Sequence, residues 1–241
     1  MRKMPETVPS PALKEKYGER VAMLVDYYRS NIAHAERFQN SVLGYLRSEA
    51  LQALTHSIRT RLKSEASLTD KLFRKAAGCE KEGTTFEITK ENLFERVTDL
   101  IGVRILHIYT QQFAEIDAIV RQIIVDETLS LIEGPVARIW DVEYAEYFKS
   151  IGVETQENKR MYTSVHYIIG SRSKFKTTCE IQVRTLSQEL WGEVDHEINY
   201  PHPIDHIACT EQIKALARIT SGAGRLVDSI YRTYADLKKE S

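Results

Sequence analysis

The chain has 241 residues, of which 42% are hydrophobic and 28% are charged, a composition typical of a globular domain and too apolar for a disordered segment. Its 33 basic and 34 acidic residues nearly cancel, which argues against a general polyanion-binding protein with a basic surface. The three cysteines form no CxxC pair, so neither a disulfide framework nor a zinc site is expected. With no apolar leader and no run of about 18 apolar residues, we expect a soluble cytoplasmic protein that does not contact the membrane.

The first half of the sequence predicts helices around one basic strand. Residues 1–12 hold three of the six prolines and are expected to form a flexible lead. An apolar stripe at helical spacing predicts helical structure over 13–54. Residues 56–63 alternate apolar and basic side chains, which predicts a strand with one basic face. The elements expected next are a helix from Ser67, a polar loop over 79–92, a strand over 100–109 and a helix over 112–126.

The second half begins with a stretch that carries no clear signal. Residues 128–160 show no sustained period, so no element is assigned there. Beyond them the pattern predicts strands over 162–170 and 178–185 and helices over 186–199 and 210–239. Helices flanking a small mixed sheet make an α/β (α+β) single domain.

Phosphate binding, if it occurs, must rely on side chains, because no glycine-rich phosphate loop is present. Residues 56–75 carry six Lys or Arg against two acids in a chain of net charge −1. Basic groups from a strand and the following helix can converge on one polyphosphate. The alternative is a solvated charged face. The residues concerned are Arg61, Lys63, Ser67, Lys71 and Arg74.

Two carboxylates stand where strands present polar groups. Asp99 lies at the mouth of the apolar strand over 100–109, where it is either a Mg²⁺ ligand or a turn residue. Glu180 shares one strand face with Gln182 and Arg184, and that face either lines a cleft or looks at solvent. Together Asp99 and Glu180 would supply the carboxylates that a metal-dependent phosphoryl-type transfer needs.

An aromatic and polar block lies on the strand predicted just before that of Glu180. Tyr162, Ser164 and His166 share a face that could offer a stacking ring and hydrogen-bonding groups to a base, although packing is the competing interpretation. The segment 191–196, WGEVDH, lies on a predicted helix and lacks the HExxH spacing of a zinc protease. For it we favour helix-to-sheet packing over a metal site.

In this order and spacing, the blocks resemble the synthetase domain of the RelA/SpoT alarmone enzymes over residues 45–205. The matching motifs are RxKxxxSxxxKxxR from Arg61, DxxGxR from Asp99, YxSxH from Tyr162, ExQxRT from Glu180 and WxExDH from Trp191. The resemblance implies a nucleotidyltransferase-like fold with helical extensions. It divides the chain into a lead and helix over 1–44, the synthetase domain over 45–205 and a C-terminal helix over 206–241.

The resemblance also implies an activity, namely transfer of pyrophosphate from ATP to the ribose 3′-hydroxyl of GDP or GTP. The product would be (p)ppGpp of the stringent response, and no hydrolase motif of the HDxxED type is present. The implied ATP-binding residues are Arg61, Lys63, Ser67, Lys71, Arg74 and Arg104. The implied acceptor-binding residues are Tyr162, His166, Gln182 and Lys159, with Asp99 and Glu180 as catalytic groups and Mg²⁺ ligands.

One departure from the family pattern leaves the acceptor open. The family's acceptor loop reads KxNGY, whereas residues 158–162 read NKRMY. Toxic small alarmone synthetases, which modify the 3′ end of tRNA or make adenosine alarmones, are therefore an alternative, and a non-catalytic nucleotide sensor is another. The resemblance allows either a homotetramer or a monomer with an antitoxin. The apolar residues expected to form core or interface on the last helix are Ile213, Leu216, Leu226, Ile230, Tyr234 and Leu237.

Overall fold

A mixed six-stranded sheet forms the centre of the computed structural model, which describes residues 9–158, 161–199 and 204–239. The strands are β1 (Ser57–Leu62), β2 (Ile101–His107), β3 (Ser130–Ile139), β4 (Glu154–Glu157), β5 (Ser164–Gly170) and β6 (Thr178–Thr185). Their order in the sheet is β1-β2-β6-β5-β3-β4. The pairs β2–β6 and β3–β4 are parallel, and the other neighbours are antiparallel. This architecture confirms the predicted fold class.

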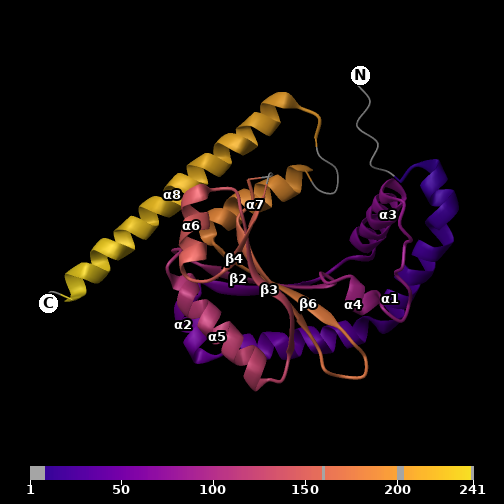
Figure 1. Ribbon diagram of the computed structural model, residues 1–241, viewed down its shortest axis with the longest axis horizontal. Coiled ribbons are helices and arrows are strands. Elements are labelled where there is room, and N and C mark those ends of the chain that lie inside the picture. The colour runs from indigo at the N-terminus through magenta and orange to yellow at the C-terminus, as the bar shows by residue number, and fades with distance from the viewer. Residues whose placement is uncertain (1–8, 159–160, 200–203, 240–241) are drawn as a thin grey trace.

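Helices cover both sides of the sheet (Figure 1). They are α1 (Pro11–Leu46), α2 (Glu49–Leu54), α3 (Glu65–Glu82), α4 (Leu93–Arg96), α5 (Gln112–Asp126), α6 (Val142–Ser150), α7 (Leu186–Asn199) and α8 (Ile207–Lys239). In Figure 1, α1, α2 and α5 lie on one side of the sheet and α7 on the other, with α8 packed over α7. Three elements have the bounds predicted from the sequence: the helix over 112–126, the strand over 178–185 and the helix over 186–199.

The helical structure predicted over 13–54 is present, and it is divided into two helices, α1 and α2. The first begins at Pro11, with the Ser10 hydroxyl accepting the Leu13 N–H at 3.3 Å. Residues 1–8 of the predicted lead lie outside the described residues. The chain leaves the helix after Leu46, and the Ser48 hydroxyl then caps α2. A serine that can satisfy the free N–H groups of a new helix favours this break over a continuous helix.

The start of α3 also differs from the prediction. Its cap is Ser64 rather than Ser67, and the Ser64 hydroxyl accepts the Ser67 N–H at 3.2 Å. The helix continues to Glu82 and ends at Gly83, whose φ of 67° suits glycine. The predicted loop over 79–92 therefore begins only at Gly83.

The stretch 128–160, left unassigned from the sequence, contains β3, α6 and β4. Its period is obscured because β3 is irregular, with register shifts against β5 on both sides of Glu133. The strand predicted from Tyr162 begins at Ser164, so Tyr162 stands just before β5. The strand predicted over 100–109 spans Ile101–His107, and the helix predicted from 210 begins at Ile207.

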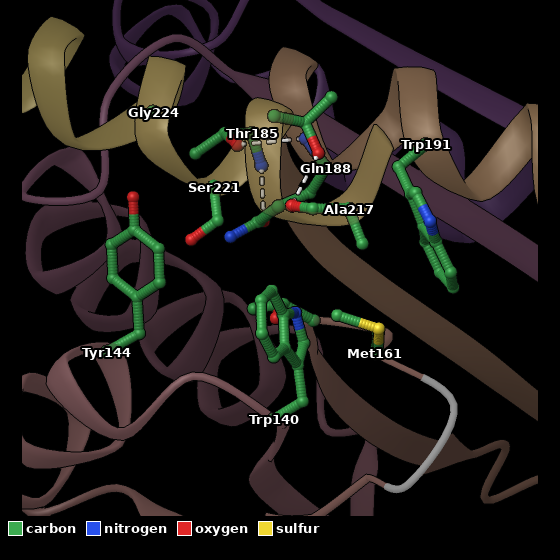
Figure 2. Close-up of a pocket in the computed structure, with 11 residues that line it drawn as sticks. Trp140, Tyr144, Met161, Thr185, Gln188, Trp191, Ala217, Ser221 and Gly224 are labelled. Carbon is green, nitrogen blue, oxygen red and sulfur yellow. Dashed lines mark hydrogen bonds between the residues drawn. The ribbon is translucent and has the colours of Figure 1, made fainter. Parts of the chain in front are cut away.

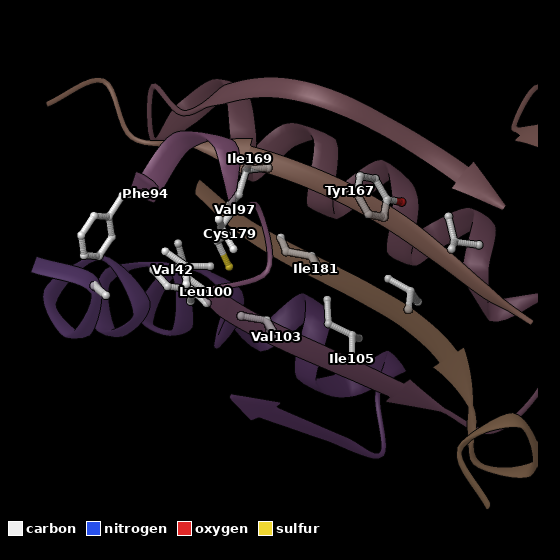
Figure 3. Close-up of a cluster of buried hydrophobic side chains, with 14 of the residues drawn as sticks. Val42, Phe94, Val97, Leu100, Val103, Ile105, Tyr167, Ile169, Cys179 and Ile181 are labelled. Atoms are coloured by element: carbon white, nitrogen blue, oxygen red, sulfur yellow. The ribbon is translucent and has the colours of Figure 1, made fainter. Parts of the chain in front are cut away.

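The two faces of the central strands differ in character. One face carries apolar side chains that pack against α1 and α5 in a single core, including Val103, Ile105, Tyr167 and Ile181 (Figure 3). The opposite face carries the polar residues of the same strands, because successive side chains of a strand point to opposite faces. The core thus fixes the register that brings the polar residues together on the other face.

The last helix, α8, is only partly packed. Its first half contributes Ile213 to a small apolar cluster with Trp191. Its second half extends away from the sheet in Figure 1, and the apolar side chains of Leu226, Ile230 and Leu237 are more than half exposed. That these side chains form an interface with another chain stays a prediction. Among the described helices, none combines the length and apolar character needed to cross a membrane.

Candidate active site

An open cleft of about 610 Å³ lies on the polar face of the sheet. Its lining comes from segments far apart in the sequence, namely β1 and α3, the turn before β2, and β3, β5, β6 and α7. The lining residues are Arg61, Lys63, Lys71, Arg74, Lys75, Thr98, Asp99, Arg138, Tyr162, His166, Glu180, Gln182 and His196. The cleft thus brings together both predicted carboxylates and most of the predicted basic residues.

The basic side of the cleft is built from β1 and α3, as the sequence predicted. Arg61 is exposed on β1, and Lys71 and Arg74 project from α3. Lys63 follows the end of β1 and is buried, and its backbone is fixed by the Tyr28 hydroxyl, which donates to the Lys63 carbonyl at 2.8 Å. Four cations from two elements therefore face one cleft, an arrangement that suits a polyphosphate.

Asp99 is held by two of these cations. Its carboxylate oxygens lie 3.0 Å from Lys63 Nζ and 2.7 Å from Lys71 Nζ. Burial by itself would raise the pKa of Asp99, but the two ammonium groups outweigh burial and hold the pKa below its ordinary value. Asp99 is therefore an ionised carboxylate whose charge is balanced from within the protein.

Glu180 is the second ionised carboxylate. His166 Nδ1 lies 3.0 Å from Glu180 Oε1, and Gln182 Nε2 donates to Oε2 at 2.8 Å. Burial alone would raise its pKa, but the hydrogen bonds from these neighbours and the charge of Arg138 lower it to about 2. Since an ionised carboxylate only accepts hydrogen bonds, Nδ1 of His166 carries the proton. The buried Nε2 of His166 has no hydrogen-bond partner among the described residues.

The residues at the cleft could bind a magnesium ion only in one particular way. Asp99 and Glu180 supply ionised oxygen ligands, which Mg²⁺ prefers. Within the described residues, however, no group of three or more His, Cys, Asp or Glu side chains could hold a metal by itself. The donor set therefore matches an ion bound by one or two carboxylates together with substrate phosphates.

Tyr162 lines the cleft beside Gln182 and His166. Its hydroxyl donates to Gln182 Oε1 at 3.3 Å, and its ring lies 6.0 Å from the His166 ring, edge on. Ser164, which the sequence placed on the same face, is buried, and its hydroxyl donates to the Val183 carbonyl at 3.5 Å. The predicted acceptor residue Lys159 lies outside the described residues.

Two predicted ATP-binding residues do not line this cleft. The Arg104 guanidinium forms ion pairs with Glu189, at 3.1 Å, and with Glu193, both on α7. Ser67 lies in the first turn of α3, where its hydroxyl accepts a hydrogen bond from Ser64 at 2.9 Å. In both cases the residue is on the expected element, but its side chain is bonded to a neighbouring polar side chain.

Sequence reasoning missed four residues of the cleft. Arg138 lies on β3, inside the stretch that carried no periodic signal. Lys75 follows Lys71 by one helical turn and could have been found from that spacing. Thr98 carried no signal, and His196 lies in the segment 191–196, which the sequence analysis assigned to packing.

A second, much smaller cavity lies beside the cleft, under α8. It holds about 20 Å³, the space of a single water molecule, and so cannot take a nucleotide. Figure 2 shows Trp140 and Met161 on one side and Ala217 of α8 on the other. The predicted packing of the segment 191–196 on the sheet does not describe Trp191, which is buried against Ile213 and Ala217 of α8 and whose indole N–H donates to the Ile213 carbonyl at 3.0 Å.

Comparison with known proteins gives a consistent result. The sequence model described as "Region found in RelA / SpoT proteins" matches residues 60–205. GTP pyrophosphokinase YwaC of Bacillus subtilis (strain 168) is 27% identical over 148 residues, which are 59% of this chain and 57% of that protein. The chain thus matches little more than half the length of this curated relative.

Solved structures show the same fold at low sequence identity. A GTP pyrophosphokinase family protein from Streptococcus pneumoniae has a TM-score of 0.59 at 16% identity, over 88% of this chain and 94% of that one. Small alarmone synthetase 1 from Bacillus subtilis has a TM-score of 0.57 at 14% identity, over 90% and 99%. The same synthetase bound to its product pppGpp has a TM-score of 0.52 at 15% identity, over 91% and 99%.

Proposed function

This chain belongs to the family defined by the region found in RelA/SpoT proteins, and on that premise we propose that it transfers pyrophosphate from ATP to the ribose 3′-hydroxyl of GDP or GTP. The observation that carries the proposal is the pair of ionised carboxylates, Asp99 and Glu180, in one cleft beside a cradle of basic side chains. The product pppGpp bound to the similar small alarmone synthetase 1 supports a guanosine acceptor. We include in the proposal that this chain does not hydrolyse the product.

The ATP side of the reaction falls to the basic cradle. Arg61, Lys63, Lys71 and Arg74 bind the triphosphate, since guanidinium and ammonium groups donate to phosphate oxygens. Mg²⁺, which Asp99 and Glu180 would hold together with the phosphates, neutralises charge on the transferred group when bound. Because the lysines already face Asp99, their charges lie where the negative charge of the phosphates would gather.

The acceptor side falls to β5 and β6. Tyr162 stacks on the base, and His166 and Gln182 contact the rest of the acceptor. Glu180 takes the proton of the 3′-hydroxyl, whose oxygen forms a bond to the β-phosphorus of ATP. The bond from that phosphorus to the oxygen bridging the α-phosphorus breaks, and AMP leaves. Orientation and charge stabilisation supply most of the rate of such a transfer.

The test is a panel of acceptors. Purified protein, Mg²⁺ and ATP labelled at the γ-phosphate are incubated with GDP, GTP, no acceptor or bulk tRNA, and the products are separated by thin-layer chromatography. Label on a guanosine nucleotide is the expected result. Label on tRNA alone would replace this proposal with a translation-blocking toxin, and no transfer at all would favour a nucleotide sensor.

A matched pair of variants tests the assigned carboxylate. Glu180→Gln should lower transfer by at least about a hundredfold, the usual size of a lost proton acceptor, while ATP binding persists. Glu157→Gln makes the same change on the exposed edge strand β4 and should leave transfer unchanged. Wild-type turnover by Glu180→Gln would contradict the assignment.

A further inference from the structure

A buried cation lies against the ring of Tyr162. Arg184, near the end of β6, is 2% exposed, and its guanidinium carbon lies 5.5 Å from the centre of the Tyr162 ring. This distance is within the range of a cation–π interaction, and such an interaction is strongest where water is excluded. Arg184 itself does not belong to the lining of the cleft, whereas Tyr162 does.

Two features of α7 fix the position of the guanidinium. Glu189, which is buried, forms an ion pair with Arg184, whose Nη2 lies 2.6 Å from Glu189 Oε2. The helix backbone also comes close at Gly192, where an added Cβ would lie 2.6 Å from Arg184 Nη1. Gly192 is therefore the residue that lets α7 approach, and the guanidinium is held between Glu189 and the helix backbone.

A purely structural ion pair between β6 and α7 does not account for all of this geometry. The Nε of Arg184 is buried without a hydrogen-bond partner among the described residues, although arginine in a structural pair normally uses its donors. Two alternate residues of β6 instead contact Tyr162. Gln182 accepts a hydrogen bond from the Tyr162 hydroxyl, and Arg184 lies against the Tyr162 ring. The ring is thereby fixed at its face and at its hydroxyl.

We propose that Arg184, held by Glu189, is a positioning residue that presents the Tyr162 ring to the base of the acceptor nucleotide. The inference rests on the proposed function, in which Tyr162 stacks on that base. A ring that is already fixed loses little freedom when a base binds, so less of the stacking energy is spent on ordering it. The effect belongs to the acceptor and not to ATP, whose phosphates meet the basic cradle at the other side of the cleft.

The experiment measures binding, so it does not depend on turnover. The ATP site is filled with an analogue that has a methylene group between the α- and β-phosphorus, and GDP or the RNA trinucleotide CCA is titrated by calorimetry. The main variant is Arg184→Met with Glu189→Gln, because removing both partners avoids leaving either of these buried charges unpaired. Arg104, the other partner of Glu189, keeps its ion pair with Glu193. We expect the acceptor Kd to rise about tenfold and the analogue Kd to change less than about twofold.

A double-mutant cycle separates positioning from general damage. Tyr162→Ala should weaken acceptor binding, and adding the Arg184 and Glu189 changes to it should cause no further loss. Tyr167→Phe removes the bond that the buried Tyr167 hydroxyl donates to Asp117 at 2.7 Å, on the other face of the sheet, and is the control for lost stability. It should leave both Kd values unchanged.

Each remaining outcome decides against the inference. An unchanged acceptor Kd in the Arg184 and Glu189 variant overturns it while leaving the proposed function intact. Equal weakening of the acceptor and the analogue, or a further loss in the Tyr162→Ala background, assigns Arg184 a general structural role. Failure of the wild-type protein to bind either GDP or CCA overturns the inference and the proposed function together.

Discussion

Mild acid should destabilise this protein through one buried histidine. His107, the last residue of β2, is 3% exposed. Burial lowers its pKa from 6.5 to about 4, and the hydrogen bond to the Tyr109 carbonyl, at 3.0 Å, only partly opposes the shift. His107 is therefore neutral in the folded protein at every pH above about 4, with its proton on Nδ1.

The size of the effect follows from the two pKa values. Between pH 6.5 and 4 the His107 side chain binds a proton in the unfolded chain but not in the folded protein. The contribution of His107 to the free energy of unfolding is therefore fully present only above pH 6.5, and it falls as the pH drops below that value. The full shift corresponds to roughly 3 kcal/mol, of which about 2 kcal/mol is lost between pH 7 and pH 5.

Urea unfolding at pH 7 and pH 5 measures this loss. His107→Asn keeps an N–H group that can donate to the Tyr109 carbonyl but does not titrate, so its free energy of unfolding should fall about 2 kcal/mol less than that of the wild type over this range. His56→Asn changes an exposed histidine and should follow the wild type. Parallel curves for wild type and His107→Asn would refute the reasoning.

Two other changes have outcomes that the geometry fixes. Gly134 has a φ of 97°, and an added Cβ would lie 2.3 Å from a carbonyl oxygen of β5, so Gly134→Ala should cost more than about 2 kcal/mol. Gly152→Ala, at a φ of 77° in open space, should cost only about 1 kcal/mol, and equal losses in urea unfolding would contradict the argument. Lys71→Met removes a cation that competes for Asp99, so Mn²⁺ should bind the nucleotide-free protein about tenfold more tightly by electron paramagnetic resonance. Lys75→Met removes an equal charge from the same cleft as a control, and unchanged Mn²⁺ binding by Lys71→Met would disprove the competition.

Much of the fold and the centre of the site follow from local patterns. The alternation in 178–185 predicts both the strand and the common face of Glu180 and Gln182, because a period of two is a property of the strand itself. The basic residues of β1 and α3 were predictable for a related reason, since a short connection forces adjoining elements to lie close together. Asp99 was marked by its place at the mouth of an apolar strand.

Other features depend on partners that no local pattern reveals. Arg104 is on the expected strand, but its guanidinium forms an ion pair with Glu189 of α7, a residue far from Arg104 in the sequence. Arg138 was missed because β3 is irregular around Gly134, which interrupts the alternation of side chains. The split of the first helix rested on a single capping side chain, Ser48, against a long favourable stripe.

The place of β6 in the sheet constrains how the chain can fold during synthesis. Among the described strands β6 is the last to be made, yet it lies between β2 and β5. Until residues 178–185 leave the ribosome, β1 with β2 and β5 with β3 and β4 can form only separate fragments, each with an unpaired edge open to aggregation. Insertion of β6 closes both edges and brings Glu180 into the cleft with Asp99. A partly made chain therefore holds no complete site, and its most vulnerable interval ends in the same event that completes the site.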